Sequence, residues 1–225
     1  MLGLAVAALL SLGQSNPWIL PVRDPGELSG TPVEDQIDLV EVDNRVLAID
    51  ARNRRTREVT LEIGEKVIGL DSRGLVAVVR TTARVLGIGT RLADFLEVRY
   101  RVGERAMPPE DVYLGDRVAI VRLDNRLLGM STTTRSWLQL DIGPRERFGE
   151  FYTGTNVVAV TTQRRAIALA PRLTKFAEIN LTPSERVLSA STNESSVTIT
   201  TPRRILIFRA GDGQWSELLR KNIPG

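Results

Sequence analysis

The sequence predicts an all-β fold made of five similar units, each contributing four short antiparallel strands. Two observations lead to this prediction: a sequence repeat of 39 to 42 residues, and short apolar or alternating runs without helical periodicity throughout the repeated region. A chain of 225 residues, 42% of them hydrophobic, is long enough to bury the core of such a fold.

The repeat is marked by an arginine that follows an apolar run. The five segments read VDNRVLAI, TTARVLGI, LDNRLLGM, QRRAIALA and TPRRILIF. Their arginines are 39, 42, 39 and 39 residues apart, and they are Arg45, Arg84, Arg126, Arg165 and Arg204.

Two further columns follow each arginine at fixed distances. Eleven positions later the five units carry Thr56, Phe95, Trp137, Phe176 and Trp215, so that four of the five residues are aromatic. Twenty positions later the first four units carry a glutamate followed by a cation; the glutamates are Glu65, Glu104, Glu146 and Glu185. Residue classes that recur in register over five units indicate one structural unit repeated five times.

Each unit is predicted to hold four strands in a fixed order. The first is the apolar run before the arginine, as at 76–79, and a turn with Asp-Asn or Pro separates it from the second, which begins at the arginine. The third carries the aromatic residue and alternates between apolar and polar residues, and the fourth follows the glutamate and cation. Short strands at this spacing are typical of propeller blades.

This pattern resembles the repeats of β-propeller proteins, nearer the pyrroloquinoline-quinone type than the WD type. The resemblance covers residues 36–225 and implies a five-bladed β-propeller of four-stranded antiparallel blades. The quinone-bearing members have many more blades than five, so no cofactor is expected here.

The fifth unit ends before a fourth strand, and the N-terminal arm, residues 14–35, offers a replacement. Glu27 resembles the glutamates of the repeat, so residues 27–35 are predicted to be the last strand of the fifth blade and to close the ring. Trp18 lies nine residues before Glu27, as the aromatic residues do in other units. Residues 17–24 could therefore add an outer strand, displace 213–221 or pack elsewhere. An open arrangement that pairs with a second chain is the alternative to closure.

The first 13 residues, MLGLAVAALLSLG, carry no charged side chain and are too few to span a bilayer as a helix. They are typical of the apolar region of a signal peptide, and the alternative is a retained N-terminal anchor. We expect export to the periplasm or the extracellular space, with membrane contact only through residues 1–13. A cytoplasmic protein is the remaining alternative.

The chain has no Cys and no His, which excludes disulfides, thiolate metal sites and imidazole catalysis. We expect no metal site. The net charge is +3, and acids are interleaved with the cations, so no specific nucleic-acid partner is expected. Only Asp38 and Glu41 among the acids lie on first strands that could line a central channel. We therefore predict no catalytic residues and a non-enzymatic protein.

The five repeat arginines admit two interpretations. They could form an anion-binding ring near one mouth of the channel. The favoured interpretation is structural, with each arginine pairing with a repeated glutamate, because a residue needed once per blade is usually needed by the blade. The aromatic column is likewise predicted to be core.

Departures from the repeat indicate where a partner could bind. An insertion at 105–117 carries Met107 and Tyr113 and is predicted to be a loop. The segment 145–156 carries Phe148, Phe151 and Tyr152, which form either a bulky strand or an exposed patch. Trp18 is a further candidate.

The sequence therefore favours a non-enzymatic binding or scaffold module that docks on a protein partner or assembly. The alternatives are a glycan-binding or glycan-active propeller, and an anion-binding module that uses the ring of arginines.

Overall fold

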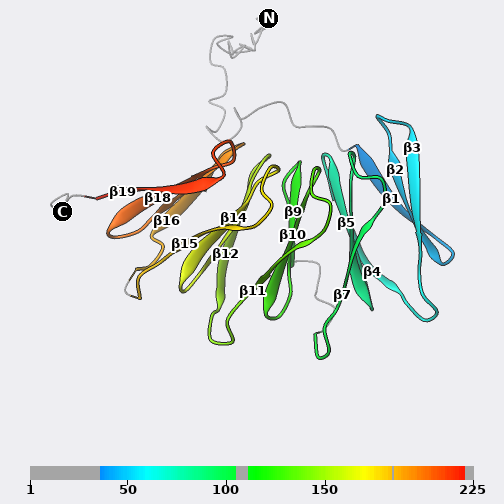
Figure 1. Ribbon diagram of the computed structural model, residues 1–225, viewed down its shortest axis with the longest axis horizontal. Coiled ribbons are helices and arrows are strands. Elements are labelled where there is room, and N and C mark those ends of the chain that lie inside the picture. The colour runs from blue at the N-terminus through cyan, green and yellow to red at the C-terminus, as the bar shows by residue number, and fades with distance from the viewer. Residues whose placement is uncertain (1–35, 105–110, 184, 221–225) are drawn as a thin grey trace, which may run out of the picture.

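The computed structural model describes residues 36–104, 111–183 and 185–220, and the regular elements in these ranges are all β-strands. The strands form five antiparallel sheets that follow one another along the chain. Figure 1 shows the sheets side by side in a row, with the first and the fifth at opposite ends. No helix that could cross a membrane occurs in the described ranges.

Within each sheet, strands that are consecutive in the chain pair with one another. The first sheet has three strands, β1 (Ile37–Val42), β2 (Arg45–Asp50) and β3 (Arg55–Thr60). The second has β4 (Val67–Arg73), β5 (Val76–Thr81), β6 (Arg84–Gly89) and β7 (Leu96–Arg99). The third has β8 (Val112–Leu114), β9 (Val118–Arg122), β10 (Arg126–Ser131) and β11 (Leu138–Asp141).

The last two sheets repeat this order. The fourth has β12 (Phe148–Thr153), β13 (Val158–Thr162), β14 (Arg165–Leu169) and β15 (Ala177–Asn180). The fifth has β16 (Ser189–Thr192), β17 (Ser196–Thr200), β18 (Arg204–Arg209) and β19 (Gln214–Leu219). The prediction of an all-β fold of repeated antiparallel sheets is confirmed.

The strand that follows each glutamate belongs to the next sheet, not to the sheet of its own unit. Strand β4 pairs with β5, because the turn at Gly74, which has a positive φ of 54°, folds the chain back on itself. The fifth sheet therefore has four strands without any contribution from the N-terminal arm, and the prediction that it lacks a strand was wrong. Residues 27–35, predicted to be the closing strand, lie outside the described residues.

The core lies between the sheets. In the three inner sheets the two middle strands are buried along almost their whole length, as β5 and β6 are, whereas the last strand β7 alternates between exposed and half-buried residues. A strand covered by a neighbouring sheet on both faces needs apolar residues on both, which accounts for continuous apolar runs such as residues 76–79.

The aromatic column fills the space between neighbouring sheets, as predicted. Trp137 and Phe176 are only 6% and 5% exposed. A Cβ added to Gly87 would lie 2.5 Å from the Trp137 ring, and one added to Gly129 would lie 2.6 Å from the Phe176 ring. Each ring therefore packs directly against a glycine of the preceding sheet, where a larger residue would collide with it.

The two end sheets depart from this contact in opposite ways. Three positions after each repeat arginine, where the ring of the next sheet packs, the first four units have small residues, and the fifth unit has Ile207. The first unit has exposed Thr56 in place of the aromatic residue. The first sheet thus lacks the ring, and the fifth lacks the space for one.

Candidate functional site

The repeat arginines lie at the start of the third strand of each four-stranded sheet. Each one forms hydrogen bonds with the repeat glutamate, with the last strand of its own sheet and with a carbonyl of the preceding sheet. Nε and Nη2 of Arg84 donate to the two carboxylate oxygens of Glu65, at 2.9 and 3.0 Å. Its Nη1 donates to Glu97 at 2.6 Å, and its Nη2 also donates to the carbonyl of Thr60 in the preceding sheet at 2.8 Å. A planar fork of donors suits a carboxylate in this two-bond arrangement.

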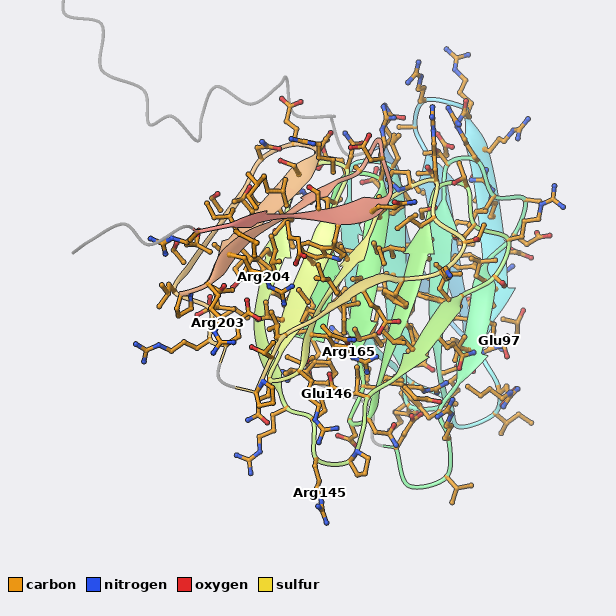
Figure 2. The ribbon with its side chains drawn as sticks, turned by 60° about the vertical axis from the view of Figure 1, so that its left-hand side comes forward. Glu97, Arg145, Glu146, Arg165, Arg203 and Arg204 are labelled. Carbon is orange, nitrogen blue, oxygen red and sulfur yellow. The ribbon has the colours of Figure 1, made fainter. Side chains whose placement is uncertain are left out.

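The same arrangement recurs in the third, fourth and fifth sheets. Arg126 holds Glu104 by two bonds of 2.8 and 2.7 Å, and both side chains are buried. Arg165 holds Glu146 and Arg204 holds Glu185 in the same way. Figure 2 shows Arg165 next to Glu146 within the fold, whereas Arg145 and Arg203 extend outward from it.

Arg45 differs from the other four. Its side chain is 44% exposed, and Nη1 contacts Glu58 at 3.3 Å. The other arginines each reach a carbonyl of the preceding sheet, and no described sheet precedes the first. The five arginines therefore do not form a ring of equivalent, open donors.

The glutamates of these pairs are held ionised. Burial by itself would raise the pKa of Glu65, but hydrogen bonds from Arg84, the Glu62 backbone and Thr81 outweigh it, so that the pKa is lowered. Glu104 and Glu146 shift in the same direction for the same reasons. In the fifth sheet the hydrogen bonds from Arg204 lower the pKa of Glu185 to about 2. The arrangement suits a permanent ion pair, not proton transfer.

The candidate partner residues that the structure describes gather on the first strands of the third and fourth sheets. The rings of Tyr113 on β8 and Phe151 on β12 stack with their centroids 3.6 Å apart and their planes 1° apart. Phe148 lies 6.0 Å from Phe151, and the guanidinium of Arg122 lies 5.7 Å from the Phe148 centroid. We call these three rings the aromatic cluster. Trp18 and Met107, the other candidates, lie outside the described residues.

A cavity of about 560 Å³ opens beside this cluster, between β12 and β16. Its apolar wall includes Phe148, Tyr152 and Leu188, and Leu188 is 48% exposed. Arg147 and Arg186 are exposed side chains that also line it. The segment 145–156 therefore has features of both a bulky strand and an exposed patch. It forms the strand β12, and its half-buried rings border an open cavity.

The acids in this cavity are poorly suited to hydrolysis. Glu185 lines it, but its carboxylate is engaged by Arg204 and Thr201. Glu150 accepts a hydrogen bond from the Tyr152 hydroxyl at 3.1 Å. A general acid at neutral pH needs a raised pKa, and each described carboxyl group whose pKa is shifted has it lowered. The described residues include no cluster of three or more acids that could hold a metal ion.

The sequence also contains a second arginine column that we did not single out as a candidate. Arg52, Arg91 and Arg172 each stand seven positions after a repeat arginine. They line a second cavity of about 640 Å³, together with Arg55 and Arg117. Their shared offset was visible in the sequence, but their convergence depends on how the sheets lie in space.

No protein-family model matches the chain, and no curated protein sequence matches it. The chain is similar to solved structures of β-propeller proteins. The N-terminal domain of Nup159 is 14% identical with a TM-score of 0.34, and the match covers 82% of this chain and 58% of that one. Apo AztD from Citrobacter koseri is 15% identical with a TM-score of 0.36, covering 81% and 59%.

A third similar structure is Prp20p from Saccharomyces cerevisiae, which was described together with its binding to Gsp1p and histones. It is 11% identical with a TM-score of 0.37, and the match covers 76% of this chain and 56% of that one. The chain spans less than two thirds of the length of each of these three structures.

Proposed function

We propose that this protein is a non-enzymatic protein-binding module and that its partner docks on the aromatic cluster and the adjoining cavity between β12 and β16. The observation that carries the proposal is the cavity of about 560 Å³, which lies beside half-buried rings. Interfaces are anchored by a few aromatic or aliphatic side chains in such pockets, surrounded by polar residues.

The lining indicates the chemistry of the partner. Phe148, Tyr152 and Leu188 offer an apolar wall that suits an aliphatic or aromatic side chain. Arg147 and Arg186 are exposed and form no ion pair among the described residues, so they favour a carboxylate on the partner next to the apolar anchor. We therefore propose a peptide segment with an apolar side chain flanked by acidic residues.

Two features support a binding role over glycan chemistry. The aromatic column is packed between sheets, so Trp137 and Phe176 offer no exposed platform for a sugar ring. The charged groups of the repeat are engaged with one another, and their shifted pKa values favour fixed charges over proton transfer.

The test is partner capture from an extract of the native host with wild-type protein and two matched variants. Leu188→Asp places a charge in the cavity, and Ile63→Asp makes the same change at a fully exposed loop residue in another part of the fold. A partner retained by the wild type and by Ile63→Asp but lost with Leu188→Asp supports the proposal. A partner that binds all three proteins equally docks elsewhere, which would contradict it.

We also propose that residues 27–35 close the ring, as the likeness of Glu27 to the repeat glutamates predicts. The first sheet has three described strands, whereas the other four sheets each have a further strand immediately before the strand equivalent to β1. An edge strand that is unpaired among the described residues supports the proposal that the N-terminal arm takes part in closure.

Closure can be tested by cysteine cross-linking, because the chain has no cysteine of its own. A disulfide between Thr31→Cys and Leu218→Cys under mild oxidation would support closure onto the fifth sheet. A disulfide between Thr31→Cys and Val40→Cys instead would contradict the predicted closing strand of the fifth blade.

We propose five blades of the propeller type for the five sheets. The signal peptide or anchor at residues 1–13 and the exported location rest on the sequence alone, because those residues lie outside the described ones.

A further inference from the structure

The second cavity, of about 640 Å³, lies at the end of the sheets opposite to the repeat arginines. It is formed where the turns between first and second strands meet the loops after the third strands. Residues of the first four sheets line it, and five of them are the arginines Arg52, Arg55, Arg91, Arg117 and Arg172. We call it the arginine cavity. Its volume is within the range of small-molecule sites.

The charge in this cavity is not balanced by its own lining. No aspartate or glutamate lines it, and none of the five guanidinium groups forms an ion pair among the described residues. Two acids that adjoin the lining in sequence are already engaged. Asp116 pairs with Arg73 at 2.9 Å, and Asp50 pairs with Arg57 and accepts bonds from Asn53. Like charges gathered in one concave site favour the binding of an anion.

The backbone beneath the arginine cavity is held in place by bonds between successive sheets. Gln36 donates its N–H to the carbonyl of Gly74 at 2.8 Å, and Leu75 donates its N–H to the carbonyl of Asp116 at 2.7 Å. The N–H of Asp116 donates to the carbonyl of Thr155, which follows β12 in the fourth sheet, at 2.8 Å. Such cross-links hold the backbone segments that carry these arginines at a fixed mutual position, so that only the side chains must be ordered when a ligand binds.

We propose that the arginine cavity binds a small molecule that carries several phosphate groups. Guanidinium groups bind phosphate oxygens through paired, charge-assisted hydrogen bonds, and five of them around one cavity exceed what a singly charged anion can use. Thr90, Thr132 and Thr133 also line the cavity and add neutral polar residues to its wall. This site is distinct from the aromatic cluster, and it uses none of the five repeat arginines.

The test is isothermal titration of the full chain with inorganic tripolyphosphate, and with ATP as a second source of a triphosphate. Arg52→Gln combined with Arg91→Gln removes two charges from the arginine cavity. Arg145→Gln combined with Arg203→Gln removes two charges from exposed positions outside it. We expect the first pair to weaken tripolyphosphate binding at least about tenfold, and the second to change it by less than about twofold. Both double variants should melt at the wild-type temperature, because all four side chains are exposed.

Tripolyphosphate should also raise the melting temperature of the wild type and of the control variant but not that of the cavity variant. The proposal is overturned if tripolyphosphate does not bind, or if the two double variants weaken it equally, since attraction to net charge alone would then account for binding. It is also overturned if ATP binds and tripolyphosphate does not, because the nucleoside would then provide the contacts.

Discussion

The repeat arginines allow a direct comparison between one buried and one exposed member of the same column. Arg126 is 2% exposed and its partner Glu104 is 4% exposed, whereas Arg45 and Glu58 are 44% and 59% exposed. The same substitution, arginine to alanine, can thus be made at two positions that differ in burial but not in place within the unit. We expect the two variants to differ widely in stability.

The size of the effect follows from what each substitution leaves behind. Arg126→Ala leaves the Glu104 carboxylate buried with the Arg101 N–H as a donor, and removing one partner of a buried pair costs about 3–5 kcal/mol. Arg45→Ala removes an exposed contact worth about 0–1 kcal/mol. For a chain of this size each kcal/mol lowers the melting temperature by roughly 2–4 °C. We expect a loss of roughly 6–20 °C for Arg126→Ala and at most about 4 °C for Arg45→Ala.

Urea denaturation and thermal melting of the two variants provide the measurement. A double variant, Arg126→Met with Glu104→Leu, should recover most of the lost stability, since apolar residues of similar volume can replace a buried ion pair at little cost. Equal melting temperatures for Arg126→Ala and wild type would refute the structural role of the pair. A loss of tripolyphosphate binding in Arg126→Ala without a loss of stability would return the repeat arginines to the status of a binding site.

Three other predictions concern charge, packing and the first sheet. The pKa of Glu185 is lowered to about 2 by Arg204, so this carboxylate stabilises the fold fully above its ordinary pKa of 4.5 and loses that contribution as the pH falls towards 2. Glu185→Gln should therefore flatten the acid limb of a stability–pH curve measured by urea denaturation, and an unchanged limb would contradict the assignment. Gly129→Leu should lower the free energy of unfolding by about 1–3 kcal/mol or more, because its side chain would meet the Phe176 ring. Ile207→Ala, at the equivalent position of the fifth sheet, should lower it by less than about 1.5 kcal/mol. Similar losses at the two sites would contradict the interpretation that the fifth sheet leaves no space for a ring. Deleting residues 1–35 should lower the melting temperature because it removes the predicted closing strand, and an unchanged melting temperature together with unchanged hydrogen exchange at the edges of the first and fifth sheets would contradict closure.

The repeat made most of the fold predictable. Residues recurring in register predicted five antiparallel sheets, a packed aromatic column and arginine–glutamate pairs, and these are present in the structure. The arginine–glutamate pairing was predictable because each residue recurs once per unit, as Arg84 and Glu65 do. Charged side chains that are buried also require a partner of opposite charge.

The sheet to which a strand belongs was not predictable in the same way. Residues 67–73 read as a strand whether they pair with the sheet before them or with the sheet after them, because alternation identifies a strand but not its neighbour. The turn at Gly74 decides the question by returning the chain onto β5. The arginine cavity was missed for a related reason, since Arg52 and Arg172 are 120 residues apart in the sequence and converge only when four sheets are placed side by side.

The carbonyl bonds made by the repeat arginines of the last four sheets give the row of sheets a direction. Arg84 reaches back to Thr60, Arg126 to Arg99, and Arg204 to Asn180, so each sheet from the second onward depends on the one synthesised before it. A nascent chain can therefore complete these contacts one sheet at a time, in the order in which the sheets emerge from the ribosome. Once the row is formed, losing the first sheet removes an acceptor from the second, whereas losing the fifth leaves every earlier acceptor bond intact. Unfolding that starts at the first sheet should thus weaken its neighbour more than unfolding that starts at the fifth.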